Sequence, residues 1–183
     1  TPKKITIYAN DVAGYFYGVQ TVKQLMAIET SKDTRHTKYL VPSVTIKDGP
    51  RFKWRAFMLD EARYFHGEVF VKQMLDQMAL LKMNTFHWHL IDDAGWRIEI
   101  KKYPLLTKVG AFRADSEIGT WKSGKTSGQP HGGFYTQEQI KDIVAYAKAR
   151  NINIVPEFEM PGHSSAAIAA YTWLGTAGIA IDV

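Results

Sequence analysis

Short apolar runs alternate with helical patterns after residue 51, and this alternation limits the fold more than any other feature of the chain. Three runs, at residues 57–60, 85–91 and 152–159, have the length and composition of buried strands. Helical spacing follows the first run at residues 69–83 and precedes the third at residues 138–149. Strands that alternate with helices pair in parallel through right-handed crossovers. The sequence therefore predicts an α/β fold with a parallel sheet.

Each predicted helix has one apolar face that we expect to pack inward. On the first helix this face is Phe70, Met74, Met78 and Leu81. On the second it is Ile140, Ile143, Val144 and Ala147. Asn151 suits the end of the second helix, and a short helix of small residues is predicted at 164–171.

Residues 1–50 have a different pattern and are predicted to be the end of a separate small α/β domain. They contain strand-like runs at residues 4–8 and 40–46 and a helical pattern at residues 14–26. Lys47-Asp-Gly-Pro50 favours a turn and marks the boundary. The predicted domains are residues 1–50 and residues 51–183.

The composition excludes several classes of protein. The 183 residues include no cysteine, which excludes disulfides, thiolate metal sites and cysteine nucleophiles. The net charge of +5 is scattered and forms no basic run, so nucleic-acid binding is not predicted. No apolar stretch reaches the roughly 18 residues of a membrane span. Thr1-Pro-Lys-Lys lacks the apolar segment of a signal peptide, and we expect it to lie inside a longer protein.

Carboxylates end all three predicted strands. Asp60 ends the first strand, Asp92 and Asp93 follow the second, and Glu157 and Glu159 end the third. The carboxyl ends of parallel strands meet at one edge of a sheet, where α/β enzymes carry their active sites. The sequence thus predicts a cleft lined with acids.

Ion pairing that only braces loops is the alternative role for some of these acids. Arg63 lies three residues after Asp60, and Arg97 lies near Asp93. Adjacent residues of a strand face opposite sides, so Asp92 and Asp93 are poorly placed to act on one bond. We expect Asp92 to belong to the site and Asp93 to brace the loop behind it.

Three histidines are candidates for the same site. His87 and His89 share one face of the second strand, a spacing that can hold a metal together with His163 or an acid. Hydrogen-bonded histidines are the commoner outcome of this spacing, so no metal is predicted. His163 follows the turn Pro161-Gly162, which directs its imidazole to the acid-lined cleft.

A long segment, residues 93–135, separates the second strand from the second helix. It contains Trp96, Trp121, His131 and Gly132-Gly133. A connection of this length in a compact domain is functional or disordered in most proteins. The tryptophans and the paired glycines favour function.

Three long motifs give the chain a family resemblance. They are Trp54-Arg-Ala-Phe-Met-Leu-Asp-Glu-Ala-Arg63, Asn84-Thr-Phe-His-Trp-His-Leu-Ile-Asp-Asp93 with Gly95-Trp-Arg-Ile-Glu99, and Pro156-Glu-Phe-Glu-Met-Pro-Gly-His163. Gly133-Phe-Tyr-Thr136 and Gly18-Val-Gln-Thr21 agree with them. In this order, and over nearly the whole chain, the motifs resemble those of the β-N-acetylhexosaminidases of glycoside hydrolase family 20.

The resemblance implies the first three or so strands of a (β/α)8 TIM barrel after the end of a small α/β domain. It implies an exo-acting enzyme without a cofactor that removes terminal N-acetylglucosamine or N-acetylgalactosamine from glycans, in a secreted, periplasmic or lysosomal compartment. The reaction of this family is retaining without a protein nucleophile, because the substrate's acetamido carbonyl attacks the anomeric carbon. A glutamate protonates the leaving oxygen, and the aspartate before it orients the acetamido group.

Carried over by position, the resemblance assigns three residues to the site. Arg55 is similar to the residue that binds the distal hydroxyls of the sugar, although it stands at the start of its strand. Asp92 and His163 are similar to the pair that hydrogen-bonds and tunes the catalytic glutamate. The candidates for structural support of the site are Asp60, Arg63, Asp93 and Glu159.

The catalytic Asp-Glu pair that the resemblance implies on a fourth strand does not occur in this sequence. The only adjacent Asp-Glu is Asp60-Glu61, on the first strand. A barrel of this type needs roughly 250 residues and eight strands. We therefore expect the chain alone to be inactive and to pair with the remainder of its barrel.

Two other functions stay open at this point. The first is a non-catalytic sugar-binding or partner-dependent fragment. The second is a metal-dependent barrel hydrolase that uses His87, His89 and His163.

Overall fold

A computed structural model defines the fold and describes residues 4–29, 38–120, 122–179 and 181. Trp121, in the long segment, lies outside these residues. The elements in chain order are α1 (Val12–Leu25), β1 (Ala27–Glu29), β2 (Lys38–Leu40), β3 (Ala56–Asp60), α2 (Glu68–Leu80), β4 (Thr85–His89), β5 (Ile91–Asp92), β6 (Gly95–Trp96), α3 (Leu105–Lys108), β7 (Phe112–Arg113), β8 (His131–Gly132), α4 (Gln137–Lys148), β9 (Asn153–Glu157), α5 (Ser165–Ala170) and the 3-10 helix η1 (Thr172–Leu174).

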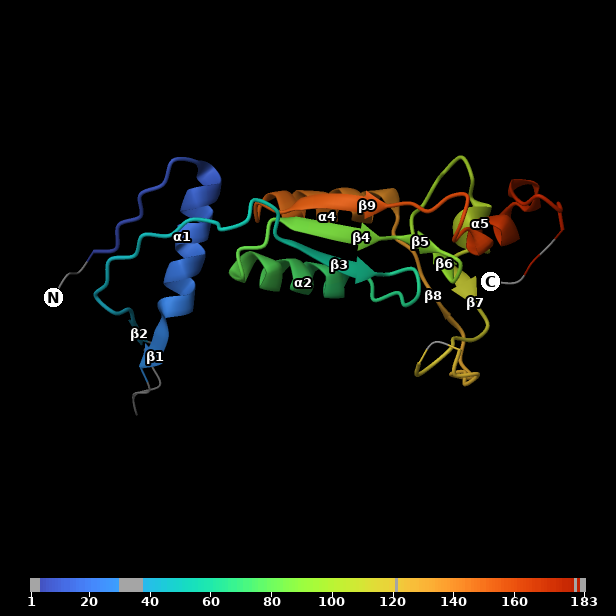
Figure 1. Cartoon of the computed structure of the whole chain (residues 1–183), viewed down its shortest axis with the longest axis horizontal. Coiled ribbons are helices and arrows are strands. Elements are labelled where there is room, and N and C mark those ends of the chain that lie inside the picture. Colours follow the sequence, from blue (N-terminus) through green and yellow to red (C-terminus); the bar gives the residue numbers. More distant parts are fainter. Residues whose placement is uncertain (1–3, 30–37, 121, 180, 182–183) are drawn as a thin grey trace.

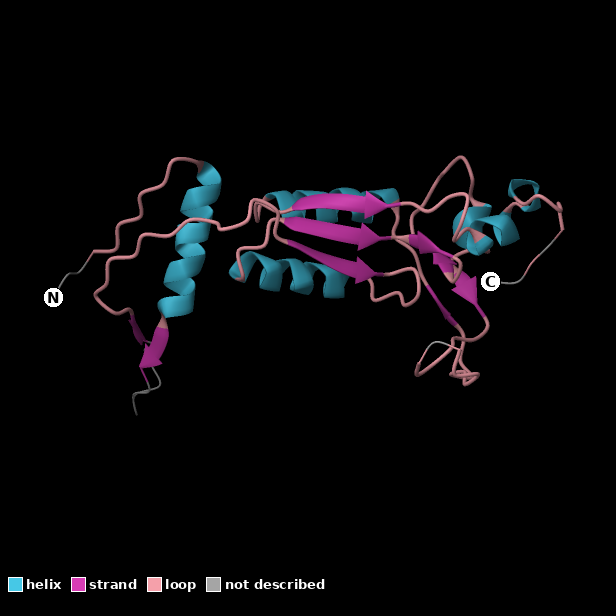
Figure 2. Ribbon diagram, in the orientation of Figure 1, coloured by secondary structure: helices cyan, strands magenta, loops and turns pink. Residues whose placement is uncertain are grey.

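β3, β4 and β9 form one parallel sheet in that order, which confirms the predicted α/β fold (Figure 1). The connection from β3 to β4 contains α2, and the connection from β4 to β9 contains α4 (Figure 2). The two helices pack against each other, since Tyr146 Oη of α4 donates to Asp76 of α2 at 2.9 Å and Arg150 Nε donates to the same carboxylate at 2.6 Å. They therefore cover the same face of the sheet.

The strand register gives the sheet two different faces. The covered face, under the helices, includes Leu59, Phe86 and Trp88, which are all buried in the main core. The other face, here called the open face, includes Met58, which is 48% exposed, and Val155, which is 37% exposed. Three rows of side chains cross the open face from β3 to β9: Ala56, Thr85 and Asn153; Met58, His87 and Val155; Asp60, His89 and Glu157.

The core face of α2 differs from the predicted one. Its buried residues are Val71, Leu75, Met78 and Ala79. Phe70 is 38% exposed and Leu81 is 66% exposed, so the prediction that both pack inward is wrong. The apolar residues beside β3 line a groove of about 340 Å³: Phe57, Phe70, Met74, Met78, Leu81 and Met83. Helical spacing shows that a face is apolar but not what lies against it.

α4 agrees better with its sequence pattern. Thr136 and Gln139 form a capping box that starts the helix, because each side chain bonds the backbone N–H of the other residue. Ile143 and Ala147 are buried as predicted, and Ile140 packs against the core, but Val144 is 45% exposed. Asn151 has φ 56°, the left-handed conformation that suits the end of a helix.

The first part of the chain keeps its predicted helix and loses its predicted strands. Asp11 caps α1 by accepting the N–H of Gly14 at 2.6 Å. Among the described residues, 4–8 form no strand, and of the second run only Leu40 lies in a strand, at the end of β2, because neither run finds a neighbouring strand over its length. Ile7 packs on α1 instead, where a Cβ on Gly18 would lie 2.6 Å from the Ile7 Cγ2 atom.

The long segment after β5 is folded. β5 pairs with β6, and β7 pairs with β8 so that Arg113 lies opposite His131. In the described part of the chain, no helix has both the length and the apolar character needed to cross a bilayer.

Candidate active site at the carboxyl end of the sheet

The third row of the open face begins the candidate site. Asp60, His89 and Glu157 are register partners on three neighbouring strands, so their side chains stand side by side at the carboxyl end of the sheet. β4 ends at His89 and the chain turns at Leu90 before β5 begins. This break brings Asp92 back beside His89, with 3.3 Å between His89 Nε2 and Asp92 Oδ2.

Asp92 is the centre of the cluster. Its carboxylate is only 4% exposed, and it faces three nitrogen-bearing side chains. Arg63 Nη2 lies 2.6 Å from Asp92 Oδ2, and His163 Nδ1 lies 3.2 Å from Asp92 Oδ1. A buried carboxylate needs such partners, because burial of an unpaired charge is very costly. The structure thus brings together Asp92 and His163, which are 71 residues apart in the chain.

His163 stands on a turn whose backbone conformation is uncommon for a residue with a side chain. Its φ is 52°, in the left-handed region that glycine tolerates most easily. Its imidazole is 54% exposed, and Nδ1 faces Asp92 and, at 3.6 Å, Asp93 Oδ2. Its other ring nitrogen, Nε2, has no partner within the described ranges and remains available to a ligand or to another acid.

Arg63 extends the cluster towards β3. Nη1 donates to Asp60 Oδ2 at 2.7 Å, and the backbone N–H of Arg63 donates to Asp60 Oδ1 at 3.0 Å, so the predicted Asp60–Arg63 pair is present. Burial acts to lower the pKa of Arg63, but Asp60, Asp92 and Asp93 raise it overall. Its side chain is 50% exposed, so part of the guanidinium faces outward from a fixed position.

Asp93 serves a different purpose from its neighbour. Its Oδ1 accepts the backbone N–H of Ser165 at 3.1 Å and the Ser165 hydroxyl at 2.7 Å. Burial acts to raise the pKa of Asp93, but the bonds from Ser165 and the charges of His163 and Arg63 keep it below its usual value. Asp93 therefore fixes the start of α5, and a role in bracing the loop behind it stays a prediction.

Glu157 and the two strand histidines form a second set of contacts. His87 Nε2 lies 2.5 Å from Glu157 Oε2, and His89 Nδ1 lies 3.7 Å from the same oxygen. Burial acts to raise the pKa of Glu157, but His89, Glu159 and His87 together lower it. Glu159 thus lies beside Glu157 at the end of β9.

Two groups of described residues have ligand atoms close enough to hold a metal ion. They are His89, Glu157 and Glu159, and Asp92, Asp93 and His163. The metal hypothesis requires His87, His89 and His163 around one ion. Neither group contains more than one of these histidines, so the described structure does not bring that ligand set together. In the second group Arg63 already supplies a positive charge at 2.6 Å from Asp92.

Arg55 lies at the opposite end of the sheet. Its Nε donates to the carbonyl oxygen of Lys82 at 2.7 Å, and Nη1 donates to that of Phe52 at 2.7 Å. Its guanidinium carbon lies 5.3 Å from the centre of the Tyr17 ring. These bonds hold the side chain at the amino end of β3, so the structure does not bring Arg55 to the cluster.

Arg97 is an important residue that the sequence interpretation placed wrongly. It does not pair with Asp93. Its fully buried guanidinium donates to the carbonyl oxygens of Glu61 at 3.0 Å, Ala62 at 2.7 Å and Ala111 at 2.6 Å. Burial lowers its pKa to about 10, which leaves it protonated at neutral pH. The position of Arg97 between the apolar residues Trp96 and Ile98 is the sequence feature that could have indicated its burial.

Glu61, the glutamate of the only Asp-Glu pair, points away from the cluster. It is fully buried, and its Oε2 accepts the backbone N–H of His66 at 2.9 Å. Burial raises the pKa of Glu61, although the N–H and the imidazole of His66 oppose this effect. Glu61 therefore holds the loop between β3 and α2 and is not a group of the cleft.

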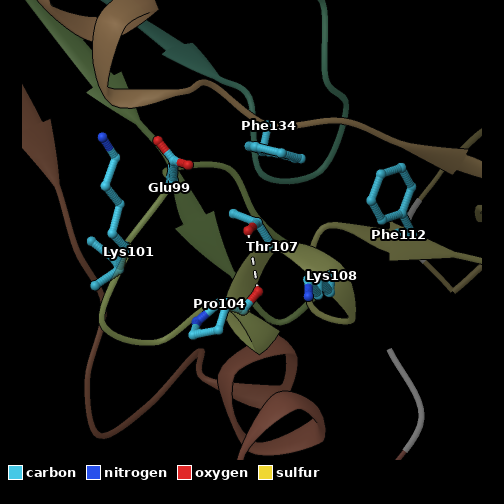
Figure 3. Close-up of a pocket in the computed structure, with 8 residues that line it drawn as sticks. Glu99, Lys101, Pro104, Thr107, Lys108, Phe112 and Phe134 are labelled. Atoms are coloured by element: carbon cyan, nitrogen blue, oxygen red, sulfur yellow. Dashed lines mark hydrogen bonds between the residues drawn. The ribbon is translucent and has the colours of Figure 1, made fainter.

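A cavity of about 540 Å³ lies beside α3, and residues such as Glu99, Thr107 and Phe134 line it (Figure 3). Two of its polar side chains are already engaged, because Glu99 accepts the N–H of Gln137 at 3.0 Å and Thr107 donates to the carbonyl of Pro104 at 3.3 Å. None of the predicted site residues lines it. The cluster around Asp92 is therefore the stronger candidate site.

Acids, an arginine and an imidazole gathered at the carboxyl end of a parallel sheet are typical of α/β enzymes. Residues 52–181 match the catalytic domain of glycosyl hydrolase family 20, and residues 1–49 match domain 2 of the same family. The chain belongs to glycosyl hydrolase family 20.

Named relatives agree with this membership. A β-hexosaminidase of Porphyromonas gingivalis is 47% identical over 171 residues, which are 93% of this chain and 21% of that protein. The crystal structure of a β-N-acetylhexosaminidase from Bacteroides fragilis superposes with a TM-score of 0.81 and 42% identity, and the match covers 100% of this chain and 34% of that one. An exo-β-N-acetylglucosaminidase from Vibrio harveyi, solved with N-acetylglucosamine, has a TM-score of 0.72 at 40% identity and covers 90% of this chain and 25% of its own. The chain thus spans about a third or less of each relative.

Proposed function

We propose that this chain forms part of an exo-acting β-N-acetylhexosaminidase that removes terminal N-acetylglucosamine or N-acetylgalactosamine from glycans. One observation carries the proposal: buried Asp92 contacts both His163 and Arg63 at the carboxyl end of the sheet. The names of the relatives support the same activity, and one of them was solved with N-acetylglucosamine.

The proposed architecture is an incomplete (β/α)8 barrel. In it, β3, β4 and β9 are three successive barrel strands, and the open face is part of the barrel interior. The order of the strands and the position of α2 and α4 on one face support this arrangement. The apolar groove beside β3 gives further barrel segments a surface to pack on. Residues 1–50 would be the end of a small α/β domain, and residues 51–183 the start of the barrel.

The proposed reaction is retaining and substrate-assisted. The acetamido oxygen attacks the anomeric carbon as the glycosidic bond breaks, and a glutamic acid gives its proton to the leaving oxygen. Water then opens the oxazolinium, with the same glutamate as base. Asp92 and His163 would tune this glutamate, because the free Nε2 of His163 can bond it while Asp92 stabilises the imidazole from the other side.

Arg63 is a better candidate than Arg55 for contact with the sugar. Its guanidinium is half exposed at the cluster, and Asp60 and Asp92 fix its orientation. A guanidinium has five N–H donors, and those not used by the two acids can bond sugar hydroxyls.

The proposed acid is not among the groups of the cluster. The 183 residues contain one Asp-Glu pair, and Glu61 of that pair is buried behind the cleft. General acid catalysis contributes about 10²- to 10⁴-fold to a rate, so the chain alone should show no appreciable turnover.

The test compares this chain with the product of its complete gene. Both are assayed with a chromogenic N-acetyl-β-D-glucosaminide and with the matching β-D-glucoside, which lacks the acetamido group. We expect turnover only by the complete product and only of the N-acetylated substrate. Appreciable turnover by the 183-residue chain would contradict the role given to a missing glutamate.

Two further results of this test would point to the alternatives. A complete product without activity that binds N-acetylglucosamine by calorimetry would indicate a sugar-binding protein. Activity that a chelator abolishes and a divalent metal restores would indicate a metal-dependent hydrolase.

A further inference from the structure

The loop that carries Arg63, between β3 and α2, is held by side chains from the long segment after β5. Arg97 donates to the carbonyl oxygens of Glu61 and Ala62. Arg113 Nη2 donates to the carbonyl oxygen of Arg63 itself at 2.5 Å. The N–H of Phe65 donates to His131 Nε2 at 2.8 Å. Successive backbone groups of the loop are thus fixed from outside it.

His131 differs from the other two side chains because its bond depends on protonation. The imidazole accepts through Nε2, so Nε2 carries no proton and the ring proton of the neutral form is on Nδ1. The ring stacks on Tyr64, with 4.1 Å between the ring centres. Gly133 lets the Phe65 ring lie close to the backbone beside His131, since a Cβ on Gly133 would lie 2.3 Å from that ring.

The surroundings of His131 favour its neutral form. Arg113 lies opposite it on β7, and Arg97, His66 and the Tyr64 phenol are the other charged and titratable groups that face it among the described residues. Burial, followed by the charges of Arg113, Arg97 and His66, keeps the pKa of His131 below its usual 6.5. Protonation would remove the acceptor for the Phe65 N–H and add a third cation beside the two arginines.

We propose that His131 is a positioning residue for Arg63: the neutral imidazole fixes the loop through Phe65, and its protonation releases the loop and moves Arg63 from its place between Asp60 and Asp92. This inference rests on the proposed function only in giving Arg63 a task at the sugar site. The positioning itself can be measured without a substrate.

The direction of the pH effect follows from the lowered pKa. The unfolded chain binds a proton at His131 near pH 6.5, whereas the folded chain binds it only at lower pH. The contribution of neutral His131 to the stability of the folded chain is therefore complete above about pH 6.5. It is lost as the pH falls through the pKa of His131 in the folded state.

The experiment is an NMR titration of the 183-residue chain from pH 8 to pH 5, in the wild type and in two variants. His131→Gln keeps an acceptor near the position of Nε2 but does not titrate. His131→Phe keeps the ring that stacks on Tyr64 but has no acceptor. The signals followed are the His131 ring, the exchange of the Phe65 amide relative to its intrinsic rate, and the Arg63 Nε–Hε group.

In the wild type we expect Phe65 exchange to become about five- to tenfold faster and the Arg63 signal to shift, both with the midpoint of His131. In His131→Gln both changes should disappear at that midpoint, and in His131→Phe exchange should be fast at every pH. An Arg63 signal that titrates alike in the wild type and in His131→Gln would overturn the proposal. A complete gene product without hexosaminidase activity would instead refute the proposed function and leave these NMR results standing.

Discussion

The covered and open faces of the β3–β4–β9 sheet come from the same strands and differ in what holds them. On the covered face, Phe86 and Trp88 are fully buried against α2, α4 and the long segment. On the open face, Met58 is 48% exposed, and His87 and Glu157 are partly exposed and paired with each other. One face is ordered by apolar packing and the other by contacts between polar groups.

The covered face therefore contributes mainly to the stability of the fold, and the open face holds the groups that can act on a ligand. Apolar burial contributes roughly 25 cal/mol per Å², so the covered face carries most of the folding free energy. Paired polar groups at a partly exposed surface contribute little to stability, but their charges can act on a ligand. Substitutions on the covered face should therefore change the free energy of unfolding more than substitutions on the open face do.

The largest difference should appear between Trp88→Ala and Met58→Ala. Trp88 is 1% exposed, and removal of such a ring from a core costs about 3–5 kcal/mol of unfolding free energy. Met58 faces the open side, and its truncation should cost less than about 1 kcal/mol. Urea denaturation of both variants measures the two losses. Equal losses would show that the open face is covered in solution.

The second difference should appear between Arg97→Met and Arg55→Met. Loss of Arg97 leaves the carbonyl oxygens of Glu61 and Ala62 without their donor and removes one of two donors to the carbonyl oxygen of Ala111, which keeps the N–H of Gly133. This should cost about 3 kcal/mol of unfolding free energy. Arg55 bonds carbonyls at the more exposed amino end of β3, so its loss should cost about 1 kcal/mol. Thermal unfolding of the two variants measures these losses. A smaller loss of stability in Arg97→Met than in Arg55→Met would contradict the role of Arg97 in holding the loop.

The smallest effect concerns the pH dependence of the open face. His89 and His87 contribute to lowering the pKa of Glu157 below 4.5, so the folded state binds its proton less readily than the unfolded state does. The contribution of Glu157 is therefore present above about pH 4.5 and is lost as the pH falls through the folded-state pKa. The stability gap between wild type and Glu157→Gln should stay below about 1 kcal/mol and should narrow on acidification. A gap that is constant with pH would argue against the His–Glu157 pairing.

Local patterns were reliable where they report a property of one element. Alternating strands and helices predicted the parallel sheet, and the turn after β9 correctly directed His163 towards Asp92. Local patterns failed where a residue distant in the sequence determines whether a side chain is buried. The apolar face of α2 was visible, but Phe70 and Leu81 line a groove, because spacing does not reveal what covers a face.

Long-range polar bonds were hardest to predict. Arg97 bonds carbonyl groups about 35 residues away, and no sequence pattern marks a backbone acceptor. Arg55 was placed by its position in a motif, whereas its side chain bonds nearby carbonyls at the wrong end of the strand. His131 and Gly133 were visible as unusual residues in a long loop, but their partners near Phe65 were not.

We expect Asp92 to carry the chemistry of the open face, and a comparison of Asp92→Asn with Asp93→Asn tests this role. The two acids are neighbours, but Asp92 contacts His163 and Arg63 in the cluster, whereas Asp93 bonds the start of α5. The measurement is the kcat of the complete gene product with a chromogenic N-acetyl-β-D-glucosaminide. We predict a loss of about 10²-fold for Asp92→Asn with little change in melting temperature, and a much smaller loss for Asp93→Asn. Full activity in Asp92→Asn, or an equal loss in both variants, would contradict the account.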